Sequence, residues 1–196
     1  MIVGITGGIG SGKTTVAKMF AEYGIPLYFS DKEAIRIIEE DGSVKLKLVN
    51  LFGEQAYTGG IYNRKYIAGI VFSDKEKLQQ LNAIVHPAIG KDFLQWYERQ
   101  RSPYVIKEAA ILFESGLYKD CDAIITVTSP EPIRVQRVMQ RDGIDENSVR
   151  RRMANQWTDS QRIRLSDFVI ENSNIDDLRN KVEEIHLILI KKMNNQ

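Results

Sequence analysis

The chain has 196 residues, of which 43% are hydrophobic and 27% are charged, and its formal net charge at pH 7 is +1. That length can form one domain with a full core, while the near-neutral charge offers no polycationic surface for nucleic acid. No apolar run approaches the ~20 residues of a membrane span, and no basic segment precedes an apolar stretch near the N-terminus. Cys121 has no second cysteine to pair with. We therefore expect a reduced, cytoplasmic protein, and nothing implies a nucleic-acid, membrane or obligate protein partner.

The segment Gly7–Thr14 matches the phosphate-loop pattern G-x-x-x-x-G-K-[ST] at every fixed position. A short apolar strand is expected before it at residues 2–5, and apolar residues at helical spacing follow it. The glycines allow successive N–H groups to surround phosphate oxygens, and the helix points the positive end of its dipole at them. Lys13 would contact the β- and γ-phosphates, and the Thr14 hydroxyl would ligate Mg²⁺. This context indicates a nucleoside triphosphate site rather than a chance glycine-rich turn, without specifying the nucleotide or the acceptor.

Residues 27–29 are predicted to form the second strand, and a helix is expected from there to residue 40. Asp31 lies where the strand gives way to this helix. An aspartate in such a place commonly only caps the helix. The carboxyl ends of parallel strands also gather ligands, so Asp31 could instead accept the proton of an attacking hydroxyl. Its position alone leaves both roles open.

Residues 41–102 are predicted to form an all-helical insertion, because helical apolar spacing alternates with turn signals and no strand-like alternation occurs. Residues 57–60 are expected to form a turn. Pro87 is expected to break or restart the last helix of this region. Arg64 and His86 are polar residues here with either structural or binding roles, and a histidine at a helix junction usually forms structural hydrogen bonds.

Further apolar runs predict strands at residues 104–112, 123–127 and 168–170, with Glu114 near the carboxyl edge of the first. Continuous apolar runs separated by helices are typical of parallel strands that are covered on both faces. We therefore expect an α/β phosphate-loop NTPase fold with a five-stranded parallel sheet flanked by helices.

Residues 134–164 carry eight arginines and four acidic residues. Such a segment could be a solvated helix face with intrahelical ion pairs. The phosphate loop favours a lid that closes arginines over the transferring phosphates and excludes water. The single domain of residues 1–196 would then consist of a core (1–40, 103–133 and 166–196), a helical acceptor subdomain (41–102) and an arginine-rich lid (134–165).

Taken in order, these motifs resemble the dephospho-coenzyme A kinase family over nearly the whole chain. Asp31 stands where the family has the second aspartate of Asp-x-Asp, and Leu112-Phe113-Glu114 is similar to the end of its Pro-Leu-Leu-x-Glu strand. Two positions depart from the family pattern: Phe29 replaces the first aspartate and Ala110 replaces the proline. Further matches in the insertion, lid and last strand are Arg64, Val71-Phe72, His86-Pro87, Gln140-Arg141-Asp142, Gln156, Arg162, Asp167 and Val169-Ile170-x-Asn172.

The resemblance implies transfer of the γ-phosphoryl group of ATP to the ribose 3′-hydroxyl of dephospho-CoA, the last step of CoA synthesis. It implies that Asp31 is the catalytic base, while Lys13 and Arg141 would stabilise charge on the transferring phosphoryl group. The expected ATP contacts are Gly10, Ser11, Gly12, Lys13, Thr14, Thr15 and, near the adenine, Asn172; the expected acceptor contacts are Arg64, His86 and Glu114. Two alternatives stay open, a kinase for another small acceptor such as a nucleoside monophosphate, and a non-catalytic nucleotide-binding switch.

Overall fold

The computed structural model describes residues 1–194, apart from the side chains of residues 175, 176 and 194. The chain forms two compact units. The sheet unit comprises Met1–Phe29 and the chain from Gln100 onward, and the helical unit comprises Ser30–Arg99. The helical unit therefore begins earlier than residue 41, the boundary expected from the sequence, because helix α2 packs against helix α5.

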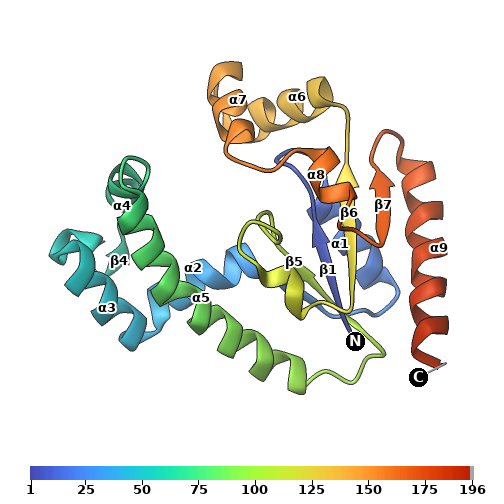
Figure 1. Cartoon of the computed structure of the whole chain (residues 1–196), viewed down its shortest axis with the longest axis horizontal. Helices are drawn as coiled ribbons and strands as arrows, with labels where there is room; N and C mark the ends of the chain where they lie inside the picture. The colour runs from blue at the N-terminus through green and yellow to red at the C-terminus, as the bar shows by residue number, and fades with distance from the viewer. Residues whose placement is uncertain (195–196) are drawn as a thin grey trace. The chain divides into compact units, whose positions relative to one another are not determined.

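The sheet unit is built on five parallel strands in the order β2-β5-β1-β6-β7 (Figure 1). The predicted five-stranded parallel sheet is thereby confirmed. One strand is shorter than expected, since β5 ends at Glu108 and the chain turns over residues 109–112 instead of continuing as a strand. The strands are β1 (Ile2–Thr6), β2 (Leu27–Phe29), β5 (Val105–Glu108), β6 (Ala123–Thr128) and β7 (Phe168–Glu171).

Different segments cover the two faces of this sheet. Helices α1 (Lys13–Glu22) and α9 (Ile175–Asn194) pack on each other and share one core with the strands, and α9 runs beside β7 (Figure 1). The opposite face is covered by the chain that follows β5, including the short helix η2 (Leu117–Asp120). Gly4 faces this second layer, where a Cβ atom would lie 2.7 Å from Leu112. The missing side chain at Gly4 therefore allows the layer to lie close to β1.

The predicted lid region contains three helices, α6 (Glu131–Asp142), α7 (Glu146–Ala154) and α8 (Asp159–Ile163). Gly143 ends α6 in the left-handed conformation, and Asp145 caps α7 by accepting from the N–H of Ser148. Residues Val135, Val138 and Val149 form a small core between α6 and α7. Local signals therefore define these helices, and this core holds the first two together.

The helical unit contains a short hairpin, so the expectation of an all-helical insertion is wrong. Two glycines with positive φ, Gly59 and Gly60, form the turn of this hairpin. Pro87 does not interrupt α5, whose residues Val85 and Ile89 are buried on either side of it. Although α5 has 24 residues, neither it nor any other helix of the described chain is long and apolar enough to cross a membrane. The elements are α2 (Ser30–Glu40), α3 (Gly42–Phe52), η1 (Glu54–Ala56), β3 (Tyr57–Thr58), β4 (Ile61–Tyr62), α4 (Arg64–Val71) and α5 (Lys75–Glu98).

Candidate active site

The phosphate loop connects β1 to α1 and requires glycine at two of its positions. Gly10 and Gly12 have φ angles of 79° and 91°, in the region that side chains disfavour. A Cβ atom on Gly10 would lie 2.5 Å from the carbonyl oxygen of Arg134, and one on Gly12 would lie 2.0 Å from Nδ2 of Asn172. The loop therefore needs glycine for its conformation and also for the close approach of its neighbours.

Helix α1 begins directly at the phosphate loop. Gly12 is its N-cap residue, and in the described structure no side chain caps the helix and no acidic residue lies in its first turn. Lys13 and Thr14 are its first two residues. The positive end of the helix dipole is thus directed at the loop, an arrangement that favours an anion there.

The carboxylate of Glu108 lies beside this loop, although sequence reasoning did not single it out. Glu108 ends strand β5, where its register neighbours are Ile5 of β1 and Phe29 of β2. The residue is only 4% exposed, and its Oε1 atom lies 3.9 Å from Nζ of Lys13. The sequence did contain a signal for it, because Glu108 is an acidic residue within an otherwise largely apolar run. The carboxyl edge of the sheet therefore holds a lysine and a carboxylate next to the phosphate loop.

Two amide side chains hold the backbone of the loop. The N–H group of Ile9 donates to Oε1 of Gln156 at 2.8 Å, and Nδ2 of Asn172 donates to the carbonyl oxygen of Ser11 at 2.9 Å. Asn172 is buried and directly follows strand β7. The structure thus places Asn172 against the loop itself, while its predicted contact with adenine stays a prediction.

A buried ion-pair network lies next to the loop. Arg134 on α6 pairs with Asp159 at 2.9 Å, and its Nη1 atom lies 2.4 Å from the point where Gly8 would carry a Cβ atom. The side chain of Arg162 on α8 is only 1% exposed and pairs with Glu114 and Asp159, each at 3.2 Å. Removing one member of such a network leaves a buried charge without compensation, so the network is expected to fix α6 and α8 firmly.

Glu114, a predicted acceptor contact, also anchors the chain between α7 and α8. Besides its pairing with Arg162, its Oε1 atom accepts from the backbone N–H of Trp157 at 2.9 Å. The Trp157 ring stacks on Phe113 with a centroid distance of 5.6 Å and an interplanar angle of 1°. These contacts give Glu114 a structural function, and its contact with an acceptor stays a prediction.

Comparison with known proteins places this site in a family. The model of the family described as CoaE, dephospho-CoA kinase, matches residues 1–177. The chain belongs to the dephospho-CoA kinase family. It is therefore an ATP-dependent kinase, as the sequence predicted.

Individual relatives agree with the family model. The dephospho-CoA kinase of Fusobacterium nucleatum is 40% identical over 185 residues, which are 93% of this chain and 95% of the relative. A crystal structure from Thermus thermophilus has a TM-score of 0.89 at 34% identity and covers 96% of both chains. The dephospho-CoA kinase from Campylobacter jejuni has a TM-score of 0.69 at 25% identity, with coverage of 97% of this chain and 98% of that chain. Both the fold and the family predicted from the sequence are confirmed.

In this member of the dephospho-CoA kinase family, the predicted catalytic arginine Arg141 lies in the last turn of α6. Its side chain is 63% exposed and pairs with the adjacent Asp142 at 2.7 Å. Hydrogen bonding to Asp142 raises the pKa of Arg141, and the same bond lowers the pKa of Asp142. Arg152 on α7 pairs with Asp142 as well. Arg141 thus shares the carboxylate of Asp142 with Arg152 in this structure.

Three other predicted site residues of this dephospho-CoA kinase family member belong to the helical unit. Asp31 lies in the first turn of α2 and is exposed. Arg64 is the exposed first residue of α4, which begins after the cap residue Asn63. His86 is half-buried in α5, and burial lowers its pKa. Their catalytic and acceptor-binding roles remain predictions.

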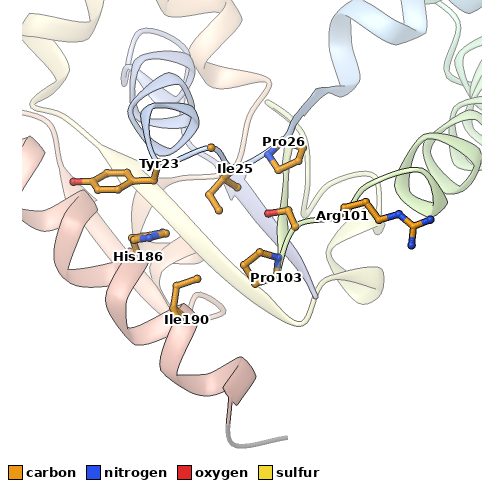
Figure 2. Close-up of a pocket in the computed structure, with 9 residues that line it drawn as sticks. Tyr23, Ile25, Pro26, Arg101, Pro103, His186 and Ile190 are labelled. Atoms are coloured by element: carbon orange, nitrogen blue, oxygen red, sulfur yellow. The ribbon is translucent and has the colours of Figure 1, made fainter.

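A pocket of about 430 Å³ in the sheet unit lies at the amino edge of the sheet, where β2 and β5 begin. Figure 2 shows Tyr23, His186 and Ile190 lining it together with Pro26 and Pro103. The phosphate loop follows the carboxyl end of β1, so this pocket is not the phosphate site of the kinase.

Proposed function

We propose that the chain transfers the γ-phosphoryl group of ATP to the ribose 3′-hydroxyl of dephospho-CoA. The observation that carries this proposal is the phosphate loop with Lys13 and Glu108 at the sheet edge, in a chain that belongs to the dephospho-CoA kinase family. Relatives named dephospho-CoA kinase align with nearly all of the chain, which supports the same acceptor here.

The nucleotide phosphates would bind to the backbone N–H groups of the phosphate loop. Residues Gly10, Ser11 and Gly12 supply the curved backbone, and Thr15 follows in the first turn of α1. Lys13 adds a positive charge for the β- and γ-phosphate oxygens. These groups are preorganised by the surrounding contacts, so they can stabilise charge on the phosphoryl group without reorganising.

The residues at the loop fit the binding of Mg²⁺ together with ATP. Thr14 provides a hydroxyl at the second position of α1, and Glu108 provides a carboxylate on the neighbouring strand. Mg²⁺ usually takes one or two protein oxygens, the substrate phosphates and water molecules rather than a full protein cage. No group of three or more His, Cys, Asp or Glu side chains that could hold a metal exists among the described residues. Bound Mg²⁺ would neutralise charge on the phosphates.

Asp31 would act as the general base. Its carboxylate accepts the proton of the 3′-hydroxyl as the hydroxyl oxygen forms its bond to the γ-phosphorus atom. The bond between this phosphorus and the bridging oxygen then breaks, and ADP leaves with the bonding electrons. Lys13 and Arg141 would stabilise the negative charge that builds up on the phosphoryl oxygens. Positioning and electrostatics supply most of the acceleration in this scheme.

The helical unit would hold the acceptor. Arg64 and His86 are its predicted contacts, with Glu114 contributing from the sheet unit. We also infer a cytoplasmic location from the intracellular reaction and from Cys121, a free cysteine.

A coupled assay of ADP release tests the proposal with dephospho-CoA, AMP, GMP and CMP as acceptors, with and without Mg²⁺. We expect turnover with dephospho-CoA and Mg²⁺, and a loss of orders of magnitude in Lys13→Ala. Turnover with a mononucleotide alone would replace the proposed acceptor. ATP binding without turnover on any acceptor would instead indicate a nucleotide-binding switch.

A further inference from the structure

Ile9 lies at the apex of the phosphate loop. The N–H group of Ser11 donates to the carbonyl oxygen of Gly8 at 3.0 Å, which closes a turn over residues 8–11. Gly10, the third residue of this turn, has a φ angle of 79°, as a type II turn requires. The hydrogen bond within the loop therefore joins the two ends of the turn, while the N–H group of Ile9, at its second position, bonds to a residue outside the loop.

The predicted lid holds Ile9 by two different contacts. The N–H group of Ile9 donates at 2.8 Å to Oε1 of Gln156, which lies in the chain between α7 and α8. The side chain of Ile9 packs against the small core between α6 and α7. The polar contact fixes the backbone of this residue and the apolar contact fixes its side chain. The apex of the loop therefore cannot move away from these helices without losing both contacts.

The segment that carries Gln156 is itself firmly anchored. The backbone N–H group of Gln156 donates to the carbonyl oxygen of Met153 in the last turn of α7 at 3.1 Å. The next residue, Trp157, donates its N–H group to Glu114 and stacks on Phe113, and both of these partners belong to the chain that follows β5. Gln156 thus lies between fixed neighbours, and its amide oxygen is a preorganised acceptor for the loop.

We propose that Gln156 is a positioning residue of the phosphoryl transfer, which acts through Ile9 to hold the phosphate loop in the shape that binds ATP. This inference rests on the proposed kinase function and adds a residue to it. Phosphate binding depends on backbone N–H groups that converge on the anion, so a displaced apex misdirects several of them at once. A lid that moved away from the loop would release the apex, and ATP affinity is therefore coupled to the position of the lid.

The test compares variants of two glutamines in the same segment. Gln156→Met keeps the approximate volume of the side chain but removes the oxygen that accepts from Ile9. Gln156→Glu keeps an acceptor oxygen at this position. Gln161→Met is the matched control, because Oε1 of Gln161 also accepts from a backbone N–H group, that of Thr158 at 2.8 Å, but this bond belongs to the capping box of α8.

The measurements are amide hydrogen exchange of the loop, kcat/KM for ATP, KM for dephospho-CoA, the affinities for ATP and adenosine, and the melting temperature. We expect Gln156→Met to speed the exchange of the Ile9 amide and to lower kcat/KM for ATP by about 10–10²-fold, the effect of a misplaced reactant. Affinity for ATP falls and affinity for adenosine does not, because adenosine has no phosphate. KM for dephospho-CoA is unchanged, since its predicted contacts lie outside the loop.

Gln156→Glu restores slow exchange of the Ile9 amide and part of kcat/KM, because it keeps the hydrogen bond but adds a negative charge near the phosphates. Gln161→Met retains both the slow exchange of the loop and the wild-type kcat/KM for ATP. Its melting temperature shows how much the loss of one such bond in this segment affects stability alone.

Equal loop exchange and equal kcat/KM in Gln156→Met and Gln161→Met would overturn the inference. Fast exchange of the Ile9 amide in Gln156→Glu would overturn it too, because the acceptor oxygen would then be irrelevant. A parallel loss of adenosine affinity and melting temperature in Gln156→Met would show a role in general stability instead. If the wild-type chain binds ATP but phosphorylates none of the acceptors, faster exchange and weaker ATP binding in Gln156→Met would still establish its hold on the loop, while the proposed kinase reaction fails.

Discussion

The ammonium group of Lys13 lies 3.9 Å from a carboxylate oxygen of Glu108, and this pair connects the phosphate loop to the end of strand β5. Strand β5 lies between β2 and β1, so Glu108 is the register neighbour of Phe29. Phe29 stands where the family resemblance places an aspartate. Glu108 on the neighbouring strand β5 thus supplies a carboxylate at this edge of the sheet, next to the position of Phe29.

Glu108→Gln should lower kcat by about 10²-fold, because it keeps the shape of the side chain but removes the charge beside Lys13. The Mg²⁺ concentration for half-maximal rate should rise as well, since a carboxylate is a better magnesium ligand than an amide. Rates measured over a magnesium titration check both effects. Glu22→Gln, which removes an exposed charge on α1, is the control. An unchanged magnesium titration in Glu108→Gln would show that Glu108 does not bind Mg²⁺ and acts only through its pairing with Lys13.

Gly12→Ala should abolish tight ATP binding, whereas Gly24→Ala should not. Both glycines have positive φ, so both variants carry backbone strain of roughly 1–2 kcal/mol. Only at Gly12 would the new Cβ atom also collide, at 2.0 Å from Asn172, while nothing lies within 4 Å at Gly24. The displaced loop should cost about 10²-fold in kcat/KM. Calorimetric titration with ATP and urea unfolding of both variants separate the two effects, and equal ATP affinities would contradict this explanation.

Arg162→Met should lower the free energy of unfolding by about 3–5 kcal/mol, because it leaves the carboxylates of Glu114 and Asp159 without their buried partner. Arg179→Met is the matched control. Arg179 pairs with Glu22 at 2.9 Å on the surface, where such a pair contributes no more than about 1 kcal/mol. Urea unfolding measures both variants, and similar losses would show that burial of the Arg162 network is unimportant.

His186 should make stability depend on pH. Burial lowers its pKa below the ordinary value of 6.5, with a smaller opposing effect of Glu183, and its Nδ1 atom lies 2.7 Å from the hydroxyl oxygen of Tyr104. The neutral imidazole is therefore favoured in the folded state, and the unfolded chain binds more protons just below the ordinary pKa. The stability that the neutral imidazole contributes is fully present above pH 6.5, the ordinary pKa. It is lost as the pH falls through the lowered pKa of His186 in the folded state.

When the pH is lowered from about 7.5 to about 5.5, the unfolding free energy should therefore decrease less in His186→Gln than in the wild type. Glutamine can still bond to Tyr104, so the comparison isolates the protonation of His186. Urea midpoints at the two pH values provide the measurement. Parallel losses in the two proteins would exclude His186 as a source of the pH dependence.

Asp31→Asn should keep the affinity for ATP but lower kcat by about 10²–10⁴-fold, because asparagine cannot accept the proton of the acceptor. Asp31→Glu retains a carboxylate and should recover part of the rate. Asp31 also lies in the first turn of α2, so a loss of about 0.3–1 kcal/mol in stability is expected from the helix dipole alone. Turnover by Asp31→Asn at the wild-type rate would remove Asp31 from the role of base.

The phosphate loop could be predicted from the sequence because consecutive residues determine it. Glu108 could not, since its position beside Lys13 depends on the pairing of β5 with β1, two strands far apart in the chain. Arg137 and Arg141 look equivalent in the sequence. The way α6 packs places one of them at the loop and the other beside Asp142.

The hairpin of the helical unit escaped prediction for a different reason. Its strands, Tyr57–Thr58 and Ile61–Tyr62, are too short to show an alternating pattern, so only the turn between them was visible. The continuity of α5 through Pro87 is likewise decided by packing rather than by local preference, because buried residues on both sides hold the helix together.

The stacking of Trp157 on Phe113 gives the chain an intrinsic optical reporter. The chain has two tryptophans, and the second, Trp96, belongs to the helical unit. In a Trp96→Phe background, the fluorescence of the remaining indole would come from the segment that joins α7 to α8. Rearrangement of this segment during turnover could then be followed in real time without attaching a dye.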